Sequence, residues 1–430
     1  MLLRIILLFL LSNSGVIAAG LNPQEKSIDD VKIYYAYDDF LPIISMNIAI
    51  TNSGIAYSDD DLVGINSVVS YLANNFLFLA DKRDDFTSEI SARNISVSFK
   101  SGMENFYISL KFMPSDIKFI TEFLQHFFYK FEVLDDDLIK AKEFLSYKRN
   151  NSYLNSNFIS YQNFSTNFFD KRYSRDAFIN DQSATKITGS EVGRFVKNLA
   201  NKKQLRIAIA GDLQESNLAG FIGDIFSPFS NDANIPHYKA GLVTSSDKEF
   251  ELEGYDQIIF YSGIIGPARN SKDFYSFYVF NHLIGGSQRN SFIGNRLREE
   301  SALTYSGYSY VNYYSNLGYL IVHFACDKTK YEQASFVIKT LLQDIKTKEF
   351  TEAELVLAKQ YLMGKYDIAF SSNSSISAFM LGLLLNDLPI TMLKERNEFV
   401  SDINLDDINK IRDKLFLEND FITTVTGDLS

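Results

Sequence analysis

Arg298 and Tyr305 are residue types that can act on a carbonyl group, and they lie seven positions apart within residues 285–307. This segment joins a glycine turn, a charged stretch with helical spacing and the start of an aromatic strand. A guanidinium and a phenol both donate hydrogen bonds, and such donors stabilise an oxyanion transition state by roughly 3–4 kcal/mol. Composition alone favours a simpler interpretation, in which Arg298 is a solvated helix residue and Tyr305 packs.

Other catalytic and metal-binding patterns do not occur in the sequence. The chain has four histidines, which are His126, His237, His282 and His323. No two of them lie within one helical turn, as a zinc motif on a helix requires. The acidic clusters at residues 59–61 and 135–137 lack the spacing of a calcium loop and stand at or just before helix starts, where carboxylates favour the helix dipole. Phosphate-loop and nucleophile-elbow patterns are also missing, so we expect no metal and no cofactor.

Length and composition indicate a multidomain globular protein. The chain has 430 residues, of which 46% are hydrophobic and 22% charged, and its net charge is −11. At about 150 residues per domain, this length suggests two to three units with real cores. An acidic chain repels nucleic acid and anionic membranes, so we expect neither as a partner.

Residues 1–19 have the pattern of a secretory signal. Arg4 supplies the positive start, residues 5–11 are apolar, and residues 12–19 suit cleavage after Ala18 or Ala19. The apolar run is far shorter than the roughly 20 residues of a spanning helix, so an uncleaved anchor is the weaker alternative. With Cys326 as the only cysteine, no internal disulfide can form. This combination favours a bacterial periplasm over eukaryotic secretion.

Helices and strands alternate along the chain without a regular strand–helix–strand rhythm. Residues with strand character occur at 31–35, 43–51, 96–101, 107–112, 205–210 and 421–426. Helical spacing of apolar residues occurs at 64–79, 115–131, 135–150, 190–200 and 406–416. We also expect residues 115–116 to cap the helix that follows them. This mixture predicts an α+β fold.

An internal duplication organises these elements. The strand at residues 205–210 ends in Gly211-Asp212-Leu213, and the last strand ends in Gly427-Asp428-Leu429. Upstream, residues 137–145 parallel residues 354–362 at nearly the same offset, which predicts a repeated unit of about 215 residues. We expect two homologous lobes, each a mostly antiparallel sheet covered by helices. The first lobe would span residues 20–226, a linker 227–248, and the second lobe 249–430.

This arrangement resembles the M16 family of zinc peptidases, the group of pitrilysin, insulin-degrading enzyme and mitochondrial processing peptidase. Residues 295–306 (NRLREESALTYS) look like the family's Leu-Arg-Glu-x-x-x-Leu-x-Tyr-Ser signature. Residues 281–286 resemble the glycine-ended helix before it, and residues 350–375 the helix and turn that follow. The resemblance implies a clamshell-like pair of lobes and assigns the Arg298–Tyr305 pair to holding a substrate backbone and its tetrahedral intermediate.

The family's zinc motif, His-x-x-Glu-His, has no counterpart here. By resemblance it should fall on the helix after Gly64, where Ser67 and Tyr71 replace the histidines and Ser70 replaces the glutamate. Neutral hydroxyls are poor zinc ligands, and a serine cannot act as general base on a metal-bound water. The family's downstream glutamate ligand should fall near residues 146–148, which hold no acid, and Glu143 is the nearest candidate.

The resemblance therefore implies a non-catalytic subunit. In several M16 systems a zinc-less chain pairs with a similar, zinc-bearing chain, and the two enclose an unfolded peptide. We expect this chain to be such a partner, inactive as a peptidase alone and contributing Arg298 and Tyr305. The alternative is a structural or peptide-binding scaffold without a role in proteolysis. An autonomous peptidase with a zinc site assembled from distant residues is a third, weaker interpretation.

Overall fold

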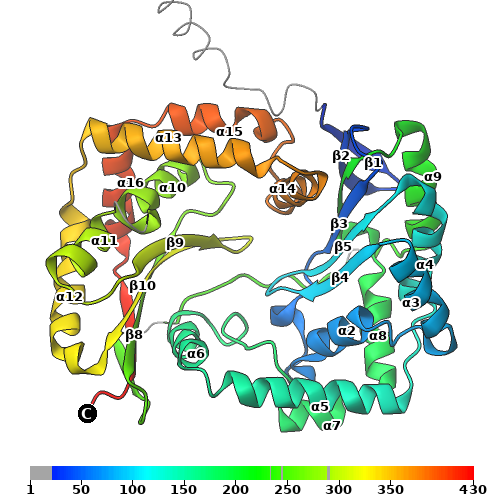
Figure 1. The fold of residues 1–430 in the computed structure, drawn as a ribbon, viewed down its shortest axis with the longest axis horizontal. Coiled ribbons are helices and arrows are strands. Elements are labelled where there is room, and N and C mark those ends of the chain that lie inside the picture. The colour runs from blue at the N-terminus through cyan, green and yellow to red at the C-terminus, as the bar shows by residue number, and fades with distance from the viewer. Residues whose placement is uncertain (1–21, 233, 244–245, 288–290) are drawn as a thin grey trace, which may run out of the picture.

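The computed structural model describes residues 22–232, 234–243, 246–287 and 291–430. The expected signal segment lies outside these residues. The described chain forms two β-sheets, each with its own set of helices, and Figure 1 shows the two lobes side by side. We call β1–β6 with their helices the first lobe and β7–β11 with theirs the second lobe.

The first sheet has six strands in the order β1-β2-β6-β3-β5-β4. Their bounds are β1 (Gln24–Ile28), β2 (Val31–Tyr37), β3 (Ile44–Ile50), β4 (Ser96–Ser101), β5 (Phe106–Phe112) and β6 (Leu205–Gly211). The second sheet has five strands in the order β7-β11-β8-β10-β9. Their bounds are β7 (Lys248–Glu251), β8 (Gln257–Gly266), β9 (Gly307–Tyr313), β10 (Gly318–Asp327) and β11 (Ile422–Gly427).

The two sheets share one topology, because strands β2 to β6 correspond in order to strands β7 to β11. In each sheet one pair is parallel, β2 with β6 and β7 with β11, and the neighbouring pairs are antiparallel. The two Gly-Asp-Leu triplets begin at the ends of the equivalent strands β6 and β11. At Gly211, φ is +126° and a Cβ atom would lie 2.0 Å from the Ile43 carbonyl oxygen, so glycine is required there. The predicted α+β fold with duplicated, mostly antiparallel sheets is confirmed.

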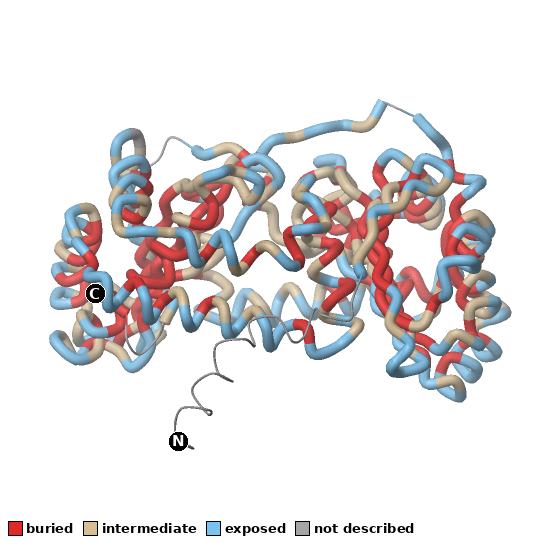
Figure 2. Tube along the Cα trace, turned by 90° about the horizontal axis from the view of Figure 1, so that it is seen from above, coloured by how far each residue is buried: buried red, intermediate tan, exposed pale blue. Residues whose placement is uncertain are grey.

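Helices flank both sheets, and all but α6 (Ser156–Phe168) and α14 (Asn373–Leu385) belong to the same lobe as the sheet they accompany. In the first lobe they are α2 (Ile65–Asn74), α3 (Arg83–Ala92), α4 (Ile117–Tyr129), α5 (Asp135–Ser152), α6 (Ser156–Phe168), α7 (Asp181–Lys186), α8 (Gly189–Leu199) and α9 (Glu215–Phe226). In the second they are α10 (Phe274–Asn281), α11 (Phe292–Gly294), α12 (Tyr331–Thr347), α13 (Glu352–Ala369), α14 (Asn373–Leu385), α15 (Met392–Ser401) and α16 (Leu405–Glu418). Two π-helical turns, His282–Gly286 and Asn295–Glu300, extend α10 and α11. Figure 2 shows buried residues gathered in both lobes.

The lobes exchange one helix each. Helix α6 lies between β5 and β6 in sequence but packs against β8 and β11 of the second sheet, whereas α14 of the second half packs against β2, β3 and β6 (Figure 1). The contact between α14 and β6 depends on small side chains. Ala208 and Ala210 of β6 belong to the same hydrophobic cluster as the buried residues of α14, whereas Ile207 and Ile209 belong to the core of the first lobe. Each lobe therefore completes the core of the other.

Hydrogen bonds also join the two lobes. Asn47 of β3 donates to Ser377 of α14 at 2.7 Å. At the tips of the β4–β5 and β9–β10 hairpins, the Glu104 carboxylate accepts from the Ser315 amide at 2.9 Å and from its hydroxyl at 2.7 Å. The Tyr173 hydroxyl donates to the same carboxylate at 2.9 Å. Equivalent hairpins of the two lobes are thus joined through one charged group.

Some predicted boundaries were wrong for identifiable reasons. The helix expected at residues 64–79 ends at Asn74, because the chain turns at Phe76, whose φ is +55°. No side-chain cap begins α4, which instead follows a short 3-10 turn at Pro114–Asp116. Within the described parts of residues 227–247 there is no helix or strand before β7; the domain boundary itself stays a prediction.

The membrane-spanning potential of the described helices is low. None of them alone has the length and apolar composition of a span, and α13 and α14 reach both only when combined across a bend of 116°.

Candidate functional site

Helix α2 carries the three residues that replace the expected zinc motif. Gly64 begins it with φ of +88°, and a Cβ atom there would lie 2.6 Å from the Ile179 amide nitrogen. The Ser67 hydroxyl donates to the Ala177 carbonyl oxygen. The Ser70 hydroxyl is buried without a hydrogen-bond partner. Ser67 therefore attaches the loop that contains Ala177 to α2, and Ser70 is a buried packing residue.

The third residue, Tyr71, makes an aromatic contact with α5. Its ring centroid lies 4.8 Å from that of Phe144, with a tilt of 30°. Helix α5 is the element on which the resemblance expects a further metal ligand, and its nearest acid, Glu143, is exposed. An aromatic pair thus occupies the contact between α2 and α5.

This donor set does not fit a zinc ion. Ser67, Ser70 and Tyr71 present neutral hydroxyls, one of them already donating to a carbonyl, where zinc requires imidazole, thiolate or carboxylate ligands. Over the described ranges, no three His, Cys, Asp or Glu side chains come together in a group that could hold a metal. A hydrolytic step cannot be assigned to the first lobe from these residues.

Arg298 lies in the π-helical turn Asn295–Glu300 of the second lobe. Buried Leu297 anchors the turn. Gly307 packs against it so closely that a Cβ atom added to Gly307 would lie 2.4 Å from Leu297 Cδ1. The Arg298 Nε donates to Glu299 Oε1 at 2.8 Å, and 27% of its side chain is exposed. The guanidinium is therefore held against a neighbouring carboxylate and is partly exposed.

Tyr305 lies in the irregular segment before β9 and is 95% exposed. The sequence predicts a strand from residue 304, but β9 begins only at Gly307. The Ser306 amide donates to the Thr304 hydroxyl at 3.2 Å, which bends the chain just before the strand. Tyr305 is therefore presented to solvent on a turn, and its joint action with Arg298 on a substrate stays a prediction.

The second lobe contains a counterpart of the Tyr71–Phe144 pair. His282 stacks on Tyr361 of α13 with centroids 4.8 Å apart and an angle of 17°. Tyr361 is the residue that parallels Phe144 in the duplicated helices α5 and α13. An aromatic pair between equivalent helices has thus been kept in both lobes.

Stability between pH 6.5 and about 4 is expected to depend on His282. Burial, followed by the charge of Lys365, lowers its pKa from 6.5 to about 4. The unfolded chain therefore binds this proton more readily, so the free energy of unfolding decreases as the pH falls through this interval. His282→Phe keeps a stacking ring without the titration. Urea unfolding across this interval should give a shallower pH dependence for the variant; equal slopes would contradict this role of His282.

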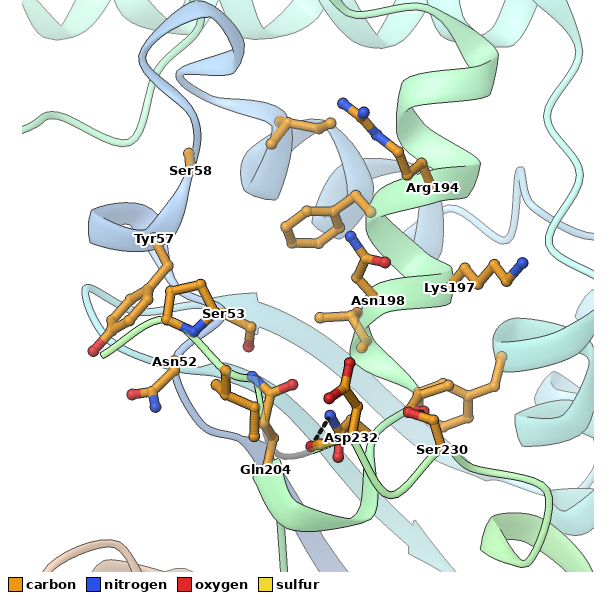
Figure 3. Close-up of a pocket in the computed structure, with 18 of the residues that line it drawn as sticks. Asn52, Ser53, Tyr57, Ser58, Arg194, Lys197, Asn198, Gln204, Ser230 and Asp232 are labelled. Atoms are coloured by element: carbon orange, nitrogen blue, oxygen red, sulfur yellow. Dashed lines mark hydrogen bonds between the residues drawn. The ribbon is translucent and has the colours of Figure 1, made fainter. Parts of the chain in front are cut away.

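A pocket of about 690 Å³ lies elsewhere in the first lobe. Figure 3 shows Arg194, Lys197 and Asn198 on α8, opposite Tyr57 and Ser58 of an earlier segment. Arg194 and Glu191, two charged residues of the pocket lining, neutralise each other in an ion pair on α8. The lining contains neither the α2 residues discussed above nor Arg298 and Tyr305, so this pocket is separate from both halves of the expected site.

Comparison with protein families and curated proteins supports the resemblance. Residues 186–362 match the family model described as peptidase M16 inactive domain. The uncharacterized zinc protease YmxG of Bacillus subtilis (strain 168) is 25% identical over 248 residues, which cover 56% of this chain and 58% of that protein. The match therefore spans less than two thirds of this relative.

Solved structures with the same fold cover nearly the whole chain. A peptidase M16 inactive domain from Pseudomonas fluorescens superposes with a TM-score of 0.83 at 16% identity, covering 95% of this chain and 98% of that one. A protease from Helicobacter pylori gives 0.81 at 13% identity, with coverage of 94% and 99%. At these identities the similarity establishes the fold alone.

Proposed function

We propose that this chain, in which residues 186–362 match the family model described as peptidase M16 inactive domain, is the non-catalytic subunit of a peptide-degrading or peptide-processing heterodimer. Its partner would be a separate M16 peptidase chain that bears the zinc motif. This chain would supply part of the wall around an unfolded peptide, together with the donors Arg298 and Tyr305.

The replacement of the zinc motif on α2 is the observation that carries this proposal. The word "inactive" in the name of the matched domain does not support the proposal, because the matched region begins at residue 186, after α2 has ended. Hydroxyls at positions 67, 70 and 71 leave no general base and no ligand set on α2. Hydrolysis by an assembly containing this chain would therefore depend on the partner's metal.

Retention of Arg298 and Tyr305 supports a role in that reaction. Both lie in the part of the chain that resembles the family signature, and the guanidinium is partly exposed. Donors held in place before the reaction stabilise developing negative charge on a carbonyl oxygen without reorganising. They have no such effect without an activated water, which Ser67, Ser70 and Tyr71 of α2 do not provide.

A scaffold without a role in proteolysis is the second candidate. The surroundings of Arg298 and Tyr305 favour the scaffold function, because Arg298 donates to the neighbouring Glu299 and Tyr305 is almost fully exposed. Such an arrangement is also what solvated surface residues adopt. Substitution of Arg298 in the assembled complex distinguishes the two functions.

We place the complex in the bacterial periplasm, on the basis of the signal pattern in residues 1–19 and the single cysteine. N-terminal sequencing of the protein from its own cells should find the chain beginning after Ala18 or Ala19. An intact Met1 would contradict export with cleavage.

The proposal is tested by purifying the tagged full-length chain from the cells that produce it. We expect a second chain to co-purify in fixed proportion, and peptide mass spectrometry to identify it as a chain containing His-x-x-Glu-His. Recovery of this chain without any protein of that sequence type would overturn the heterodimer.

A further inference from the structure

A second pocket, of about 570 Å³, lies between the last turns of α5 and the start of α6. Its lining consists of Phe144, Tyr147, Lys148, Asn151, Ser152, Asn155 and Phe158. The volume is within the usual range of ligand pockets, roughly 300–1,000 Å³. The pocket begins where the Tyr71–Phe144 pair occupies the contact of α2 with α5, and thus adjoins the replaced zinc motif.

Three of the residues that line it, Phe144, Tyr147 and Phe158, are aromatic. Phe144 is 45% exposed and Tyr147 is 66% exposed on a mostly polar helix. The opposite wall is rigid, because Phe158 packs on Tyr153 at 5.1 Å and on Phe178 at 5.6 Å. Exposed rings facing a fixed aromatic wall suit the insertion of another planar side chain.

The electrostatics of the pocket are opposite to those of the chain as a whole. The chain has a net charge of −11, yet the lining contains Lys148 and no carboxylate. Beside the pocket, the Arg149 guanidinium lies over the Tyr153 ring at 5.0 Å, and the Tyr153 hydroxyl donates to Asp176 at 2.7 Å. The charge within the lining is therefore that of Lys148. Glu143 is the nearest acid on α5 and is not part of the lining. The pocket therefore favours a ligand that combines a ring with a negative charge.

We propose that this pocket binds the C-terminal residue of an extended peptide whose last side chain is aromatic. The side chain enters between Tyr147 and Phe158, and the peptide's terminal carboxylate pairs with the Lys148 ammonium. Asn151 and Asn155 supply amide groups to the peptide backbone. This inference rests on the proposed peptide-holding function and specifies which end of the peptide the first lobe binds.

The absence of tryptophan from the chain permits a direct test. The probe is an acetylated alanine peptide that ends in tryptophan with a free carboxylate, titrated with the full chain. We expect saturable binding with a blue shift of the tryptophan emission. The same peptide with a C-terminal amide should bind about threefold more weakly, as for the loss of one exposed ion pair. A peptide with tryptophan at its start and alanine at its end should show no saturation.

Substitutions locate the binding. Tyr147→Ala and Phe144→Ala should each weaken binding of the free-acid peptide about tenfold, as expected for an aromatic contact residue. Lys148→Gln should lower its affinity to that of the amide and leave the amide's affinity unchanged. Tyr361→Ala on α13 is the matched control, because Tyr361 parallels Phe144 in the duplicated helix and lies outside the pocket. It should leave binding unchanged.

Three results would overturn the proposal: equal affinity for the acid and amide peptides, equal effects of Tyr361→Ala and Phe144→Ala, or unchanged binding in Tyr147→Ala. Failure here is distinguishable from failure of the heterodimer. If the wild-type chain fails to bind the tryptophan peptide while the zinc-bearing partner still co-purifies with the Tyr147→Ala and Lys148→Gln variants, only the pocket assignment is wrong, and the heterodimer stands.

Discussion

Arg298→Ala is expected to lower the turnover of the assembled peptidase at least a hundredfold while leaving the assembly intact. Loss of one donor to an oxyanion costs about 10²–10³ in rate. The side chain is 27% exposed and forms an ion pair with the adjacent Glu299. Tyr305→Phe, which removes only the phenol hydroxyl, should also lower turnover.

Arg296→Ala is the matched control for this experiment. Arg296 lies on the same π-helical turn and pairs with Glu300 at 2.7 Å and Asp344 at 3.3 Å. We expect a small loss of stability and unchanged turnover, because exposed ion pairs contribute about 0–1 kcal/mol. If Arg298→Ala also leaves turnover unchanged, the scaffold interpretation replaces the catalytic partnership.

Phe164→Ala is expected to destabilise the chain by about 3–5 kcal/mol, the usual cost of deleting a buried phenylalanine side chain. Phe164 lies on the exchanged helix α6 and is fully buried. Its ring stacks on Tyr261 of β8 at 5.6 Å and on Phe168 at 5.1 Å. Urea unfolding measures the loss, and Phe336→Ala, at an exposed position on α12, should cost less than about 0.5 kcal/mol.

A double-mutant cycle tests whether this contact depends on close packing. A Cβ atom at Gly263 of β8 would lie 2.6 Å from Phe164 Cζ, so Gly263→Ala alone should cost about 1–3 kcal/mol. In a chain that also carries Phe164→Ala, the added methyl group enters space that the ring has left. The double variant should therefore be more stable than the sum of the single losses predicts; strict additivity would contradict the packing.

The duplicated fold could be predicted because its signals are local. Each Gly-Asp-Leu triplet begins at the last residue of a strand, and alternation or helical spacing identified sheet and helix segments mainly in the first lobe. The exchange of α6 and α14 could not be predicted in the same way. It depends on which sheet face carries small residues, such as Ala208 and Ala210, and that becomes visible only once strand order is known.

One part of the candidate site could be predicted from the sequence and another part could not. The replacement of zinc ligands by Ser67, Ser70 and Tyr71 follows from the family resemblance, which locates the motif on this helix, and from the residue types found there. The pocket beside α5 was missed, because its lining joins residues of two helices whose relative orientation no sequence period fixes. A usable signal did exist, since Phe144 and Tyr147 stand three positions apart on a mostly polar helix. Exposure, which decides their role, required the structure.

Hydrolysis of a fluorogenic peptide by the separate and combined subunits tests the central claim most directly. The purified chain, its His-x-x-Glu-His partner and their equimolar mixture would be assayed with and without EDTA. We predict hydrolysis at full rate by the mixture only, and its loss on addition of EDTA. Hydrolysis by the lone chain that EDTA abolishes, or a partner as active alone as in the mixture, would contradict the account.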